Sequence, residues 1–225
     1  MSNPSLLQLK LRSFFQETYA RMSLYALALL FLLVLSSDFL ANDKPLVVYY
    51  KNNWYFPVLY IYPETTFGGD FQTEADYLDP YVIDKIKING WYLMPPIPFS
   101  YDKHDFLANK PQPAAPSWQH FLGTDDQGRD ILARLLYGLR TSMLFGFILS
   151  ALSLVIGVVI GSMCGYFGAL TDLFLQRFLE IWSGLPTLYL LIILSSFIQP
   201  NFFWLMLVML LFSWTRFVGV VRAEF

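Results

Sequence analysis

The chain has 225 residues, of which 56% are hydrophobic and only 14% are charged. A soluble domain would be about a quarter charged, so this composition indicates a membrane protein with one polar section. The net charge of −2 excludes the basic surface of a nucleic-acid-binding protein. A single cysteine, Cys164, excludes a disulfide framework or a cysteine metal site within the chain.

The first 40 residues predict a short cytoplasmic tail followed by a membrane span. Residues 1–21 carry more basic than acidic side chains, which favours a cytoplasmic location for them. Residues 22–40 are apolar and, at ~1.5 Å per residue, just long enough to cross a hydrocarbon layer of ~30 Å. A cleaved signal peptide is the alternative, but its leading region would be long, and Phe39 stands where a cleavage site needs a small residue.

Residues 41–141 are predicted to form a periplasmic insert that ends in an amphipathic helix. Acidic residues outnumber basic ones here, and no segment is apolar enough to span a membrane. Aromatic and β-branched residues at 47–50 and 54–62 are typical of strands, and the prolines between 95 and 116 predict irregular structure after them. The insert is either a docking surface for another protein or a cap packed on the helices of its own subunit.

A polar turn lies near the end of this insert, at residues 122–130. Two glycines there permit unusual backbone conformations, and the neighbouring Thr and Asp side chains can accept hydrogen bonds from nearby N–H groups. Asp130 stands where a helix needs a cap. The apolar residues of 131–139 repeat at helical spacing, so local chemistry predicts an ordered turn that opens a helix at the outer membrane face.

Residues 142–225 are predicted to form the transmembrane core. The expected spans cover about 142–166, 179–198 and 202–221. The first of these carries small residues at every fourth position, Gly157, Gly161 and Gly165. Small residues at this spacing let helices approach closely within lipid, so we expect this helix to be a packed interior element.

The second expected span has two further features. Pro186 lies inside it and predicts a kink. Arg177 and Glu180 are spaced for an i, i+3 ion pair near one end of the span. This pair is either an interfacial ion pair that orients the helix or, since acids within membranes often act in transport, a functional group.

The sequence carries no motif of an enzyme. It has no GxxxxGK[ST] phosphate-binding loop and no Ser/His/Asp set, and the acidic stretch at 123–130 does not have the spacing of a calcium-binding EF-hand loop. His104 and His120 have no second metal ligand at helical spacing and are expected to be satisfied or solvated. We therefore expect no catalytic residue, no metal site and no cofactor.

Three stretches resemble the dipeptide/oligopeptide (DppC/OppC-like) permease family, the membrane subunits of ABC importers. Residues 120–130 resemble its LGTDxxGRD signature, and residues 165–186 resemble its next block, a GYxGG…D…MR…D…P pattern, with Ala169, Gln176 and Glu180 as mild departures. The long aromatic insert resembles the Yej-type branch, which is associated with uptake of oligopeptides and microcin C.

This resemblance implies a fold and a location. The fold is an all-α polytopic membrane protein, similar to a type I ABC importer permease with four of the usual six spans, and with an irregular, partly β periplasmic insert. The location is the bacterial inner membrane, crossed several times. The chain stops at about the position where the family's EAA coupling loop should begin, so we expect a truncated reading frame or a fragment.

The resemblance also implies partners, a mechanism and site residues. The implied partners are a second homologous permease subunit, a cytoplasmic ABC ATPase, a periplasmic peptide-binding protein, a peptide substrate and membrane lipid, with no nucleic acid. Transport would proceed by alternating access. Gly161 is expected at the contact with the partner permease, and Arg129 is expected to pair with Asp126 and Asp130. The signature residues expected to form an outer gate are Gly123, Thr124, Asp125, Gly128, Arg129 and Asp130.

Two other functional classes remain open from the residues alone. One is a membrane-anchored scaffold whose periplasmic insert binds a partner protein, although a simple anchor needs no glycine-rich packing face. The other is a channel, but channels need polar pore rings, which the second and fourth predicted spans lack.

Overall fold

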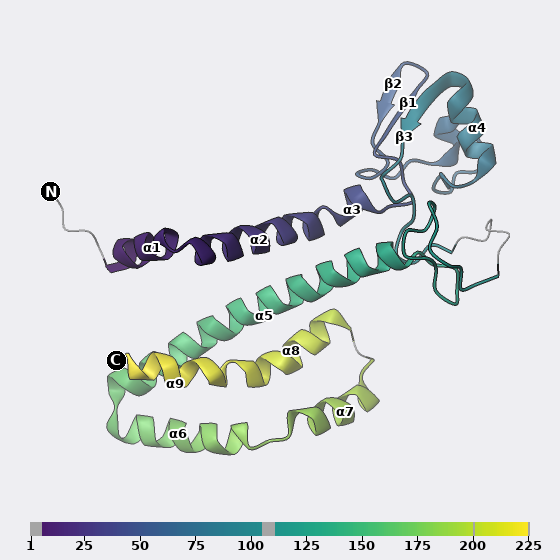
Figure 1. Cartoon of the computed structure of the whole chain (residues 1–225). Helices are drawn as coiled ribbons and strands as arrows, with labels where there is room; N and C mark the ends of the chain where they lie inside the picture. Colours follow the sequence, from purple (N-terminus) through teal and green to yellow (C-terminus); the bar gives the residue numbers. More distant parts are fainter. Residues whose placement is uncertain (1–5, 105–110, 200, 225) are drawn as a thin grey trace. The chain divides into compact units, whose positions relative to one another are not determined.

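The computed structural model describes residues 6–104, 111–199 and 201–224. The remaining residues, which include the start of the predicted cytoplasmic tail and Pro200 of the turn between the last two predicted spans, lie outside the described parts. The chain divides into two compact units, residues 1–140 and 141–225, with helix α5 (Ile131–Phe167) running from one into the other (Figure 1). Each unit is described by itself.

The first unit begins with three consecutive helices, α1 (Leu6–Gln16), α2 (Thr18–Leu35) and α3 (Ser37–Leu40). Helix α2 is long and apolar enough to cross a membrane, and most of its side chains are exposed, as lipid-facing side chains would be. The predicted tail is thus helical from Leu6, and the helix that contains the predicted span begins at Thr18. Neither proline nor glycine interrupts this part of the chain, so the helix extends beyond its apolar segment.

A small domain follows, built on a three-stranded antiparallel sheet of order β2-β1-β3. Its strands are β1 (Val47–Tyr50), β2 (Asn53–Tyr55) and β3 (Gly90–Leu93). A 3-10 helix, η1 (Glu64–Phe67), and helix α4 (Pro80–Asn89) cover one face. The buried core consists of Val48, Tyr50, Phe67, Ala75, Tyr77, Val82 and Ile86.

This domain differs from the sequence-based expectation in two respects. The strand expected over residues 54–62 ends at Tyr55, because Pro57 follows it and the chain turns back on the carbonyl of Phe56. Helix α4 was not predicted, although Pro80 occupies its first turn and the Asp79 side chain accepts a hydrogen bond from Tyr81 N at 2.9 Å.

The base of the small domain is joined to the end of the first helical segment. Leu40 O accepts from Ile97 N at 3.0 Å, and Asn42 N donates to Ile97 O at 3.1 Å. A second buried cluster, formed by Ala41, Ile97, Phe99 and Ala133, packs α3 against the first turn of α5.

The second unit holds the membrane core. Besides α5 it contains α6 (Ala169–Ser183), α7 (Thr187–Phe197), α8 (Phe202–Ser213) and α9 (Thr215–Ala223). By length and composition, α2, α5 and the continuous Phe202–Ala223 segment qualify as membrane spans, and the α6–α7 pair makes a fourth if it counts as one broken span. The protein is therefore a polytopic, mostly helical membrane protein with a small antiparallel sheet.

Two predicted boundaries in this unit change. The amphipathic helix expected at 131–139 and the span expected at 142–166 form one helix of 37 residues. At ~1.5 Å per residue such a helix exceeds the ~30 Å hydrocarbon thickness, so its ends extend beyond it. The span expected at 179–198 is not one helix, since α6 and α7 meet at 69° across the break at residues 184–186. Pro186 cannot donate a helical hydrogen bond, so the expected kink becomes a full interruption.

Candidate functional site at the start of helix α5

The turn before α5 is organised around the carboxylate of Asp125, whose side chain is only 15% exposed. Its Oδ1 accepts from the backbone N–H groups of Gln127 and Arg129, both at 2.9 Å. Its Oδ2 accepts from Arg129 Nε at 2.8 Å and also pairs with the guanidinium of Arg134. One carboxylate thus holds two cations and two backbone donors.

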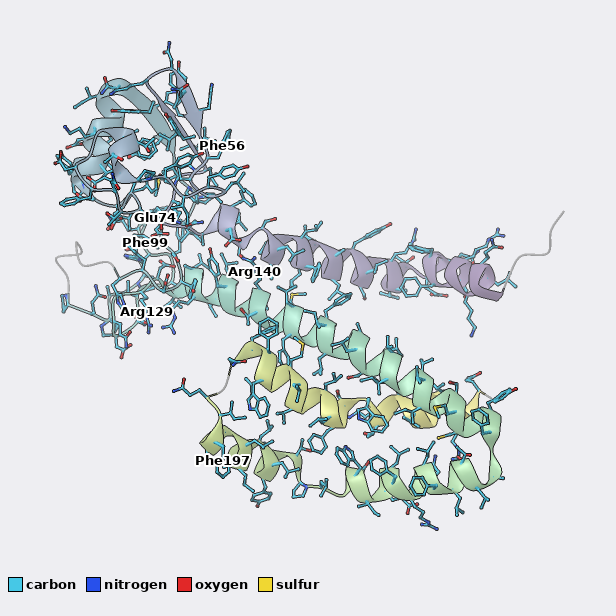
Figure 2. The ribbon with its side chains drawn as sticks, turned by 180° about the vertical axis from the view of Figure 1, so that it is seen from behind. Phe56, Glu74, Phe99, Arg129, Arg140 and Phe197 are labelled. Carbon is cyan, nitrogen blue, oxygen red and sulfur yellow. The ribbon has the colours of Figure 1, made fainter. Side chains whose placement is uncertain are left out.

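This arrangement corrects the expected pairing of Arg129. The sequence placed Arg129 beside Asp126 and Asp130, but its ion pair is with Asp125, with Nη2 to Oδ2 at 2.7 Å, while Asp126 is exposed. Asp126 points away because Gly128 N donates to Asp125 O, which closes a tight turn around the intervening residues. Figure 2 shows Arg129 at the start of α5 and Arg140 farther along the same helix.

Electrostatics favours the ionised form of Asp125. Partial burial alone would raise its pKa. The hydrogen bonds from the backbone and guanidinium of Arg129 and from Gln127 N–H outweigh that effect and hold the pKa of Asp125 well below its usual range. The turn is therefore built on a permanent negative charge at neutral pH.

Two glycines of the signature are required by the backbone. Gly123 and Gly128 both have φ of +79°, which side-chain-bearing residues rarely adopt. A Cβ at Gly123 would also overlap the carbonyl oxygen of Ala114. Next to it, Thr124 N donates to Ala114 O at 3.0 Å and Ala114 N donates to Thr124 Oγ1 at 2.9 Å. The signature turn is consequently fastened to the proline-rich segment that precedes it.

Asp130 is the N-terminal cap of α5 and is 1% exposed. Its Oδ1 accepts from Ala133 N at 2.7 Å, and its Oδ2 lies 2.8 Å from His120 Nδ1. His120 is itself buried, with its ring 4.4 Å from that of Phe99. Sequence reasoning treated His120 as satisfied or solvated; it is satisfied, and it belongs to the site, because it holds the capping carboxylate.

The next turns of α5 are tied to α3. Tyr137 Oη lies 2.8 Å from Asp38 Oδ1 and 3.0 Å from Ala41 O. Arg140 pairs with Asp38 Oδ2 at 2.7 Å. Asp38 directly follows the apolar run of the first predicted span, but its two partners lie some hundred residues away, and residue spacing does not reveal them.

The glycine face of α5 packs within this chain. A Cβ at Gly157 would lie 2.5 Å from Phe217 Cβ, and one at Gly161 would lie 2.8 Å from Val221 Cβ and 3.0 Å from Val218 O. Both contacts are with α9. Close helix packing at these glycines therefore occurs within the subunit, and a contact of Gly161 with the partner permease stays a prediction. Gly165, the third small residue, is half-buried.

The ion pair expected between Arg177 and Glu180 forms at 2.6 Å, with both side chains exposed. A second pair, which the sequence did not indicate, joins α6 to α9 through Asp172 Oδ2 and Arg222 Nη2, also at 2.6 Å. Asp172 is much less exposed than Glu180, so water screens this pair less; unlike the predicted pair, which lies within α6, it joins two helices.

The membrane unit also contains a cavity of about 720 Å³ between α5, α6, α7 and α8–α9. Its lining mixes apolar side chains with hydroxyl groups and the cation of Arg216. The hydroxyl groups come from Ser150, Ser153, Ser183, Thr187, Ser213 and Thr215. Within the described ranges, no group of three or more His, Cys, Asp and Glu residues is placed to hold a metal ion.

Comparisons with known proteins agree with this architecture. Residues 157–225 match the family of binding-protein-dependent transport system inner membrane components. The chain is 52% identical over 203 residues, 90% of its own length, to the inner membrane ABC transporter permease protein YejE of Escherichia coli K12. The chain is thus similar to ABC importer permeases of the DppC/OppC-like family. It is a multi-pass protein of the bacterial inner membrane.

Other members of this family are also similar. The chain is 43% identical over 227 residues to the peptidoglycan transport system permease protein YejE of Agrobacterium fabrum, covering 90% of this chain and 59% of that protein. It is 32% identical over 144 residues to the oligopeptide transport system permease protein OppC of Haemophilus influenzae, covering 64% of this chain and 45% of that protein. The chain spans 60% of the length of the Escherichia coli YejE protein and 59% of the length of the Agrobacterium fabrum one.

Proposed function

We propose that the chain forms part of the translocation pathway of an ATP-driven, binding-protein-dependent importer of oligopeptides. The observation that carries this proposal is the signature turn, a rigid network around Asp125 at the start of a glycine-faced membrane helix. The names of its relatives, which are oligopeptide, dipeptide and peptidoglycan transport permeases, support peptides or peptide-bearing fragments as the substrate class. Microcin C-like peptides fall within that class.

The mechanism we propose is alternating access with an outer gate at residues 123–130. Asp125 joins the turn to Arg134, which is one helical turn inside α5. Asp130 joins the same helix to His120. Because these contacts link the turn and the helix end, the two move as one body, and a movement of the turn is transmitted directly to the span.

The complete importer would need further subunits. The sequence has no phosphate-binding loop, so ATP hydrolysis belongs to a separate cytoplasmic ATPase. A second homologous permease subunit would form the other half of the pathway, and a periplasmic binding protein would deliver the peptide. We expect the small domain at residues 41–104 to offer contacts to such a protein.

Transport measurements in proteoliposomes test this function. We expect the full-length permease, reconstituted with its partner permease and ATPase, to accumulate a labelled oligopeptide only when ATP and the binding protein are both present. Competition by unlabelled peptides and by peptidoglycan fragments then identifies the preferred substrate. Failure of the assembled complex to transport either class, with the small domain still binding a protein partner, would favour the scaffold function instead.

A further inference from the structure

The small domain exposes a turn that is unusually apolar for a surface. Between residues 53 and 62 there is no charged side chain. Three consecutive residues, Leu59, Tyr60 and Ile61, are 63%, 64% and 72% exposed, and Phe56 is exposed beside them. A run of exposed apolar residues is unfavourable in water, and such surfaces mark sites that contact a protein, a ligand or a membrane. We call residues 56–61 the apolar turn and ask what it contacts.

The exposure does not arise from a loose loop. Leu59 N and Tyr60 N both donate to Phe56 O at 3.0 Å. Pro57, in the middle of the turn, is fully buried. Tyr62, which follows the turn, packs its ring 5.2 Å from that of Tyr55 and 6.3 Å from that of Phe67 in the domain core. The fold therefore holds these apolar side chains outward.

The apolar turn lies at the end of the sheet that leads to the membrane span. Tyr55 is opposite Val48, so the chain leaving β2 returns toward the start of β1 and hence toward α3. At this end Leu46 N donates to Leu93 O at 2.8 Å. Leu93 and Ile97 are four residues apart, which an extended chain spans in at most ~14 Å. Ile97 N donates a hydrogen bond to Leu40 O at the end of α3. Figure 2 shows Phe56 on the side of the domain where α3 joins it.

We propose that the apolar turn inserts into the headgroup region of the outer leaflet and anchors the small domain to the lipid surface. The apolar surface of α2 ends at Leu35, and the exposed side chain of Phe39 extends it toward the small domain. The headgroup layer adds ~5–8 Å on each side of the hydrocarbon core. Large side chains of the apolar turn, which lies near the outer end of the α2 span, can reach this layer. Aromatic residues with a polar tip, such as Tyr60, are favoured at this depth.

Spin labels in vesicles test the proposal in the full-length permease. Cys164 is replaced by Ala, and single cysteines are placed at Tyr60 and, as a second position in the apolar turn, at Ile61. The control is Ile88, which is 75% exposed in α4. It lies near Gly90, which pairs with Tyr50 at the opposite end of the sheet. We expect labels at 60 and 61 to collide with oxygen several-fold more, and with a water-soluble nickel chelate several-fold less, than the label at 88.

Two outcomes would overturn the proposal. Equal access of the nickel chelate to positions 60, 61 and 88 in vesicles would show that the apolar turn stays in water. Protection of positions 60 and 61 that appears only after the periplasmic binding protein or the partner permease is added would assign the turn to a protein interface. Using two label positions keeps the test valid if one substitution disturbs the turn.

Discussion

At the scale of single residues, Asp125 is the central residue of the turn, because its carboxylate binds two backbone N–H groups and two guanidinium groups. Its pKa is depressed in the folded protein, so its contribution to stability is fully present above the unfolded-state pKa of about 3.9 and is lost as pH falls below that value toward the folded pKa. We therefore expect the turn to keep its order from neutral pH down to about pH 4 and to lose it in stronger acid.

Hydrogen exchange at Gln127 and Arg129 measures this, since both backbone N–H groups bond to Asp125. Asp125→Asn should raise their exchange at neutral pH and lower the free energy of unfolding by about 1–3 kcal/mol, because two guanidinium groups lose their shared carboxylate. The matched control is the exposed neighbour, Asp126→Asn. Equal exchange in both variants would show that the ion pairs contribute no order.

The residues also show what a sequence can reveal about such a site. The glycines, the capping position of Asp130 and the need of Arg129 for an acidic partner all followed from local chemistry. The choice of Asp125 over Asp126 depends on the direction in which the turn closes, and the role of His120 depends on a contact across the turn. Neither is contained in residue spacing.

At the scale of elements, the packing of α5 against α9 is the feature most open to test. Gly161→Leu places a side chain where a Cβ would already lie 2.8 Å from Val221. Overpacking of this kind costs about 1–3 kcal/mol, so we expect a clear drop in thermal stability of the purified protein. Val159→Leu, at an exposed position of the same helix, should leave stability unchanged. Equal melting temperatures for both variants would contradict the packing described here.

Elements with a strong hydrophobic pattern were predicted well, and those fixed by tertiary contacts were not. The apolar runs of α2, α5 and the Phe202–Ala223 segment predicted spans at these places, although the first run also allowed a cleaved signal peptide. Strand β3 begins at Gly90, a residue type that by itself indicates a turn. Gly90 belongs to a strand because it pairs with Tyr50 of β1. The interruption at 184–186 was expected as a kink, but the size of the bend depends on packing that the sequence does not specify.

At the scale of the whole molecule, the charge flanks and spans predict a topology. We expect the N-terminus, the turn at residues 168–172 and the C-terminus in the cytoplasm, and residues 41–140 in the periplasm. Labelling of single cysteines with an impermeant maleimide in intact cells measures this, with Cys164 replaced by Ala. A cysteine at Asn89 should react without permeabilisation, and one at Gly168 only after it. The reverse pattern would invert the topology.

In the proposed mechanism, the network around Asp125 acts as an outer gate rather than as a static turn. Peptide uptake and binding-protein-stimulated ATP hydrolysis by the complete reconstituted importer test it most directly, with Asp125→Ala compared against the exposed Asp126→Ala. Co-purification of all subunits first establishes that each complex assembles. The gate predicts that Asp125→Ala abolishes most uptake or uncouples ATP hydrolysis from it, while Asp126→Ala transports normally. Normal, coupled transport by an assembled Asp125→Ala complex would contradict the gate and leave the network a purely structural turn.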